Sequence, residues 1–148
     1  MWNEIKSQDD IDSFLEMYGW FHDGCIKELK YTSGAFVSKN LSMRPFDHDH
    51  VLRIVFQRQY RDPSVIEMEF MRIKRLHLVP ADLNYDCIIM DTTMLMKDNY
   101  IYWCDEGNIS ENEIDDYGGT LIFAERVRWR TAEEFIGSDE VYRAVSSD

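Results

Sequence analysis

Two neighbouring segments with a two-residue period constrain the fold of this chain most strongly. Residues 51–59 and 65–73 each place apolar side chains at alternate positions and polar or mixed side chains between them. The apolar positions are Leu52, Ile54 and Phe56 in the first segment and Ile66, Met68 and Phe70 in the second. Successive side chains of a strand point to opposite faces, so both segments are predicted to be half-buried strands. Residues 61–64 have turn composition, which predicts an antiparallel hairpin.

The N-terminal region predicts a short amphipathic helix over residues 8–17. Ser7 can cap its start, and Asp10 stands three residues later, which is an acidic variant of the capping box. One apolar stripe follows at the i, i+3, i+4 spacing of a helix, formed by Ile11, Phe14 and Leu15. Gly19 is the expected end of the helix.

Most of the remaining chain is predicted to be extended. Further strands are expected at residues 25–32, 35–43, 75–79, 85–97, 99–105 and 120–129, with Pro80 ending one of them. Residues 98–99 form the expected turn of a second hairpin, residues 105–117 a loop, and residues 131–134 a short helical turn. The predicted fold is α+β: one domain over 1–148, with an N-terminal helix followed by a mostly antiparallel sheet or sandwich of about seven strands.

Composition places the chain among ordinary globular proteins. Hydrophobic residues make up 45% of its 148 residues and charged residues 30%. No apolar run approaches the roughly 18 residues needed to cross a membrane, and the N-terminus has no signal-peptide pattern. The three cysteines, Cys25, Cys87 and Cys104, are far apart and form no CxxC pair. We therefore expect reduced cysteines packed as small apolar residues, and a cytoplasmic location.

The charge is strongly negative and unevenly distributed. A formal net charge of −12 makes bare nucleic acid and anionic membranes unlikely partners. Residues 98–117 contain seven acids and no Lys or Arg, whereas residues 51–79 contain six basic residues and three acids. This segregation predicts an acidic region and a mildly basic sheet face. Glu67 and Glu69 are expected to be solvated, or paired with Arg53 across the hairpin.

Sequence motifs for catalysis are lacking. The chain has no GxSxG, no HExxH and no glycine-rich phosphate loop, since Gly118 and Gly119 precede a strand rather than a helix. We therefore predict a non-enzyme without a cofactor. The tightest candidate metal motif places His48 and His50 on one side of an extended segment, with His22 or His77 as a third ligand. A polar turn in solvent explains the same residues.

The segment Trp20-Phe21-His22-Asp23-Gly24 joins the predicted helix to the first long strand. We interpret it as a structural joint, in which Trp20 and Phe21 fill the core. Asp23 would accept hydrogen bonds from His22 or from turn amides. A catalytic His-Asp dyad is the alternative, but adjacent residues rarely orient each other as a dyad requires.

The motif Phe21-His22-Asp23, between a helix and the strand that begins near Cys25, resembles a group of small bacterial proteins. They carry a Phe-His-Asp motif between an N-terminal helix and a β-rich body, and the late segment 118–123 extends the similarity. Some of these proteins are classed as immunity proteins of polymorphic toxin systems. The resemblance implies a protein that binds and neutralises a toxin, and it implies no catalytic role for His22 or Asp23.

The leading hypothesis is therefore a protein-binding module whose acidic loop contacts a basic toxin. The expected partner-binding residues are Asp105, Glu106, Glu111, Glu113, Asp115, Asp116 and Tyr117. Apolar anchors would come from the aromatic residues Tyr100, Tyr102, Trp103 or Tyr117. In the alternative interpretation the loop is merely solvated and the tyrosines belong to the core. Two other hypotheses remain: a metal- or small-molecule-binding domain using His22, His48 and His50, and a structural module that forms homodimers through a sheet edge.

Overall fold

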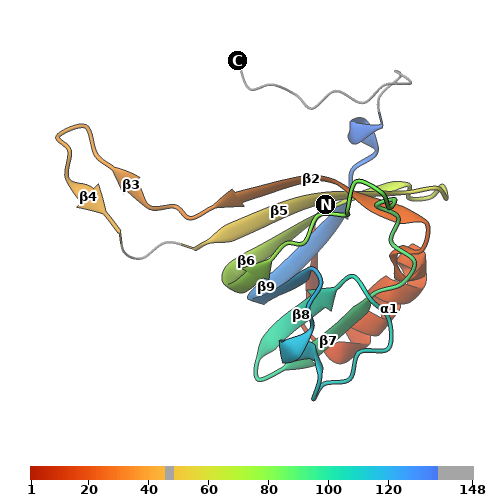
Figure 1. The fold of residues 1–148 in the computed structure, drawn as a ribbon. Coiled ribbons are helices and arrows are strands. Elements are labelled where there is room, and N and C mark those ends of the chain that lie inside the picture. Colours follow the sequence, from red (N-terminus) through yellow and green to blue (C-terminus); the bar gives the residue numbers. More distant parts are fainter. Residues whose placement is uncertain (46–48, 137–148) are drawn as a thin grey trace.

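The structure, a computed structural model, describes residues 1–45 and 49–136 (Figure 1). Within these ranges the chain forms one seven-stranded antiparallel sheet, one α-helix and a separate two-stranded arm. The predicted α+β class, with an N-terminal helix and a mostly antiparallel sheet, is confirmed. Of the two arrangements left open by the sequence, the structure adopts a single sheet rather than a sandwich.

The sheet has the strand order β2-β5-β6-β9-β8-β7, and β1 also pairs with β9. The strands are β1 (Asn3–Ile5), β2 (Gly24–Thr32), β5 (Val51–Arg58), β6 (Val65–His77), β7 (Thr93–Lys97), β8 (Tyr100–Cys104) and β9 (Leu121–Thr131). Strand β9 pairs with β6 on one side. On its other side the first half pairs with β8 and the second half with β1.

The predicted hairpin forms with the expected faces. Phe56 pairs with Ile66 and Leu52 pairs with Phe70 in the β5–β6 ladder, and all four side chains are buried. Strand β6 runs on to His77, so the predicted segment 75–79 begins as a continuation of the same strand. A register shift between Ile73 and Arg75 marks the place where alternation breaks.

Helix α1 (Gln8–Tyr18) covers one face of the sheet, and its start has the predicted capping box. The Asp10 backbone N–H donates to Ser7 Oγ at 3.1 Å, and the Ser7 N–H donates to the Asp10 carboxylate at 3.1 Å. The apolar stripe, extended by Tyr18, is buried in the main core. The helix ends where Gly19 takes the left-handed conformation, with φ of 62°.

A second, smaller core lies on the opposite face of β8 and β9. Trp103 packs into the main core, so its neighbours Tyr102 and Cys104 point to the other face. There they pack with Leu121 and with Ile114, which comes from the loop between β8 and β9. The sheet is therefore covered on its second face, at this end, by a loop rather than by a helix.

Two predicted elements differ from the structure. Residues 35–43 do not form one strand; they turn back on themselves, because Leu41 donates its N–H to the Ser38 carbonyl at 2.8 Å. The result is the arm, in which β3 (Phe36–Val37) pairs with β4 (Met43–Arg44). In residues 85–97, only β7 is a strand. Before it, Asp86 accepts a hydrogen bond from the Ile88 N–H at 3.0 Å, which competes with ladder pairing.

Strand β1 was not predicted, because a strand of three residues is too short to show an alternation of apolar and polar side chains. The expected helical turn near 131–134 is present as η3 (Glu133–Phe135). No helix in the described ranges is long and apolar enough to cross a membrane.

Candidate functional site: an acidic loop fixed to the sheet

The predicted partner-binding residues all lie in the loop of residues 105–117, between β8 and β9. The loop is anchored rather than free. Ile114 is fully buried in the smaller core, and its N–H donates to the Ser110 carbonyl at 3.0 Å. A short 3₁₀ turn, η2 (Ile114–Asp116), follows. The backbone of the acidic loop is thus held on the sheet by apolar burial and local hydrogen bonds.

Two of the six loop carboxylates turn inward and complete this scaffold. Asp105 accepts a hydrogen bond from the Tyr117 hydroxyl at 2.6 Å. Asp115 accepts from the Tyr102 hydroxyl at 3.0 Å and from Lys97 Nζ at 2.5 Å. Asp105, Asp115 and Tyr117 are therefore placed as internal supports of the loop.

The electrostatics follow from these contacts. The hydrogen bond from Lys97 lowers the pKa of Asp115, and the same bond raises the pKa of Lys97. Burial, followed by the bond to Asp115, raises the pKa of Tyr102 to about 12. Burial, followed by Asp105, also raises the pKa of Tyr117. At neutral pH Asp115 and Lys97 are therefore charged, and Tyr102 and Tyr117 are neutral.

The other four loop acids face solvent. They are Glu106, Glu111, Glu113 and Asp116. Glu113 accepts a hydrogen bond from the Ser110 hydroxyl at 2.7 Å, which orients it locally. The sequence thus identified seven residues of one loop, and the structure divides them into four that can reach a partner and three that support the loop.

Two of the predicted aromatic anchors are unavailable to a partner. Trp103 and Tyr102 are buried in the two cores, so the alternative prediction that the tyrosines belong to the core is correct for Tyr102. Tyr100 and Tyr117 are partly exposed and pack at the border of the smaller core.

Two of the six basic residues predicted to form a mildly basic face are paired with acids, Arg53 with Glu67 and Arg72 with Asp49 and Glu125. Glu67 is completely buried, so its predicted solvation is wrong; it pairs with Arg53, the other predicted outcome. Arg130 also donates to Glu67, from Nε to Oε2 at 2.7 Å. The alternating arginines of β9 were the sequence signal for this second partner, but only the register of β9 beside β6 places Arg130 opposite Glu67.

The Phe-His-Asp segment is a tight joint between α1 and β2. Phe21 is buried with its ring centroid 4.8 Å from that of Phe56, as predicted. Trp20 was predicted to fill the core but does not: it is 46% exposed. His22 Nδ1 lies 3.2 Å from Asp23 Oδ2, and the Asp23 carbonyl accepts from the Gln59 N–H at 3.1 Å. The contact predicted between His22 and Asp23 is present.

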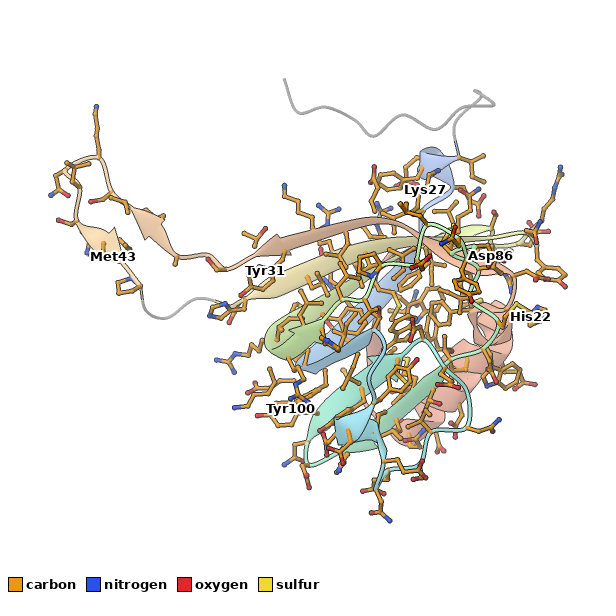
Figure 2. All side chains as sticks on the ribbon, viewed as in Figure 1. His22, Lys27, Tyr31, Met43, Asp86 and Tyr100 are labelled. Atoms are coloured by element: carbon orange, nitrogen blue, oxygen red, sulfur yellow. The ribbon has the colours of Figure 1, made fainter. Side chains whose placement is uncertain are left out.

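The three histidines in the described ranges do not gather in one place. Tyr31, at the base of the arm, holds His50 through a 2.6 Å hydrogen bond to Nδ1, and Figure 2 shows His22 at the other end of the sheet. His77 Nδ1 lies 2.9 Å from the Gly119 carbonyl. His48 lies outside the described residues. In the described ranges no three His, Cys, Asp or Glu side chains are grouped to hold a metal ion.

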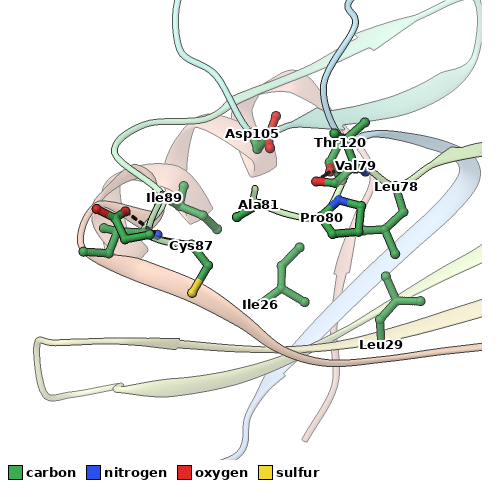
Figure 3. Close-up of a pocket in the computed structure, with 12 residues that line it drawn as sticks. Ile26, Leu29, Leu78, Val79, Pro80, Ala81, Cys87, Ile89, Asp105 and Thr120 are labelled. Atoms are coloured by element: carbon green, nitrogen blue, oxygen red, sulfur yellow. Dashed lines mark hydrogen bonds between the residues drawn. The ribbon is translucent and has the colours of Figure 1, made fainter. Parts of the chain in front are cut away.

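A cleft that the sequence did not indicate lies where the connection from β6 to β7 crosses β2. Its volume is about 360 Å³, and it is lined mainly by apolar side chains of β2 and of residues 78–89 (Figure 3). The crossing segment is tied at both ends: the Val79 N–H donates to Thr120 Oγ1 at 3.0 Å, and the Ile89 N–H donates to the Gly24 carbonyl at 2.7 Å. Asp86 and Asp105 supply carboxylates to its lining.

Comparison with known protein families, with curated proteins and with solved structures gave no match. The resemblance carried by Phe21, His22 and Asp23 therefore stays a prediction. What the geometry supplies is an acidic loop anchored to the sheet and a mainly apolar cleft with two carboxylates in its lining.

Proposed function

We propose that this chain is a protein-binding module that neutralises a basic protein partner, in the manner of an immunity protein of a bacterial toxin system. The observation that carries the proposal is the fixed acidic loop. Glu106, Glu111, Glu113 and Asp116 face solvent on a backbone that buried Ile114 holds against the sheet.

A rigid loop favours binding because little conformational entropy is lost when the partner docks. Four carboxylates on one loop also attract a cationic surface over a distance of about one Debye length, roughly 8–10 Å at physiological salt. Opposite charge speeds the encounter and disfavours acidic competitors. A toxin with a basic substrate groove has the surface that such a loop complements.

The placement of nearby cations supports the same proposal. Lys97 and Arg75 both reach the loop, but both bind Asp115. Lys97 donates to the Asp115 carboxylate, and Arg75 donates to the Asp115 backbone carbonyl at 3.0 Å. On the sheet face, Arg128 pairs with Glu69, with Nε to Oε2 at 2.7 Å. Within the described ranges none of the four solvent-facing loop carboxylates forms a salt bridge, so all four are available to a partner.

The proposal predicts that a gene for a large toxin lies directly upstream of this gene, and the test uses the C-terminal domain of that toxin as the partner. Binding is measured by calorimetry at low and high salt, and protection is measured as growth when both proteins are coexpressed. The loop variant carries Glu106→Gln, Glu111→Gln, Glu113→Gln and Asp116→Asn. The control variant neutralises four exposed acids elsewhere: Asp9→Asn, Asp12→Asn, Glu16→Gln and Asp62→Asn.

We expect the unmodified protein to bind and protect, with affinity that falls as salt rises. The loop variant should bind at least about tenfold more weakly and lose most of the salt dependence. The control variant, with the same change in net charge, should bind nearly as well as the unmodified protein. Equal binding by the loop variant, or no binding by the unmodified protein, would contradict the proposal.

A further inference from the structure

The arm, residues 33–45, exposes apolar side chains far from the core. It extends from the ends of β2 and β5 and projects away from the main sheet (Figure 1). Leu41 is 84% exposed and Met43 61% exposed, and Val37, paired with Met43, is also exposed. A projecting hairpin with this much exposed apolar surface is typical of an interaction element.

Residues 33–45 also carry a net positive charge, although the whole chain is acidic. The thirteen residues of the arm include Lys39 and Arg44 and contain no Asp or Glu, whereas the whole chain has a net charge of −12. The surface that receives the arm should therefore combine apolar groups with carboxylates.

The cleft beside residues 78–92, which we call the strap, has this combination. The strap contains Asp82, Asp86 and Asp91 and no Lys or Arg. Its exposed apolar side chains are Leu78, Val79, Leu83, Tyr85, Ile88 and Met90. The cleft volume of about 360 Å³ lies within the usual range for sites that enclose a ligand, roughly 300–1,000 Å³.

In one molecule the arm points away from the cleft. Figure 2 shows Met43 on the projecting arm and Asp86 on the opposite side of the main sheet. We propose that the arm of one copy docks in the cleft of a second copy, so that the chain forms a symmetric homodimer with two identical arm–cleft contacts.

Charge and symmetry favour a second copy as the occupant. The basic arm meets the acidic strap, and the apolar side chains of the arm meet those around the cleft. A two-fold axis makes each contact occur twice, so the second contact forms within an already assembled pair. This dimer contact differs from pairing through a sheet edge, and it uses none of the four solvent-facing loop acids. The dimer and the proposed toxin binding can therefore fail separately.

The first test is sedimentation equilibrium of the full chain over a range of concentrations. We expect a reversible dimer. The arm variant Val37→Glu with Met43→Glu should raise the dimer dissociation constant at least about tenfold, because it places acids against the acidic strap. The control Tyr60→Glu with Ile136→Glu changes two exposed side chains outside both surfaces and should leave the constant unchanged. A monomer at every concentration, or a dimer indifferent to the arm variant, would overturn the proposal.

The second test asks whether arm and cleft contact each other. Ile88→Arg puts a cation at the cleft lining and leaves the arm intact. It should be monomeric alone, as should the arm variant. A mixture of the two should form heterodimers through the one intact arm and the one intact cleft. If the mixture remains monomeric while the unmodified chain dimerises, arm and cleft are not partners.

The third test locates the contact through Cys87, which lines the cleft (Figure 3). Oxidised glutathione is added to the Met43→Cys variant. The two thiols then give up their hydrogens to the glutathione disulfide and form a bond between two copies. We expect a covalent dimer that is lost when Cys87→Ser is added. Tyr60→Cys, at a site of similar exposure, should give little covalent dimer. A Met43→Cys dimer that persists without Cys87 would contradict docking at the cleft.

Discussion

The carboxylate of Glu67 is fully buried on the sheet, and Arg130 donates to its Oε2 atom from Nε at 2.7 Å. Arg53, from the strand on the other side, binds Oε1. Glu67 therefore connects three neighbouring strands through its side chain. The two arginine side chains keep 47% and 25% of their surface exposed, so water screens the outer part of this group.

Replacing Glu67 by Gln should destabilise the fold by about 1–3 kcal/mol. The amide keeps the shape but removes the charge that both arginines bind, and the loss is limited because the arginines can reach water. Urea unfolding of the two proteins measures the change. Glu69→Gln, at the edge of the same network, is the comparison and should cost less. Equal stability of Glu67→Gln and the unmodified protein would show that the pairing contributes little.

Replacing Gly19 by Ala should cost about 1–2 kcal/mol. Gly19 has a φ of 62°, and a Cβ there would lie 3.1 Å from an Arg58 guanidinium nitrogen, so strain and crowding add. Gly118→Ala is the matched control, because a Cβ at that position meets nothing within 4 Å. Thermal unfolding of both variants should show a clear drop for the first and little change for the second.

Stability should fall as pH rises from 10 towards 12. The pKa of Tyr102 is raised from about 10 to about 12 by burial, so above pH 10 the unfolded chain releases a proton that the folded chain retains. The stabilisation is complete below pH 10 and is lost as pH passes the folded value. Tyr102→Phe should be less stable at pH 7, because it lacks the bond to Asp115, but its stability should fall less steeply between pH 10 and 12. An unchanged slope would contradict this assignment.

Thiol labelling should distinguish the three cysteines. Cys87 is exposed, whereas burial raises the pKa of both Cys25 and Cys104 and lowers their thiolate fraction. At pH 8, iodoacetamide should modify Cys87 first, Cys25 slowly, and Cys104 only after unfolding. Mass spectrometry of digested protein identifies the order. Rapid labelling that persists in Cys87→Ser would show that another thiol is accessible.

Local patterns were sufficient where an element is defined by its own residues. Helix α1 followed from the Ser7 cap and one apolar stripe, and the β5–β6 hairpin followed from alternation around a turn-forming segment. The loop of residues 105–117 was recognised by its acids. Its division into supporting and exposed carboxylates was not predictable, because Asp115 is distinguished only by Lys97 and Tyr102, which lie on β7 and β8.

The arm and the cleft show the same limit. Nothing in the sequence of residues 35–43 indicates that the chain leaves the main sheet there. The strap residues likewise show no spacing of apolar side chains that predicts a cleft.

The sequence by itself determined the α+β class, the helix, the central hairpin and the strongly acidic character of the chain. These properties depend on the spacing of apolar side chains and on the charges of residues that are close together in the sequence. The tertiary structure decided which carboxylates are free, which arginines are paired, and where apolar side chains remain exposed. Those properties arise from contacts between residues far apart in the chain, such as Glu67 with Arg130, and strand register alone brings such residues together.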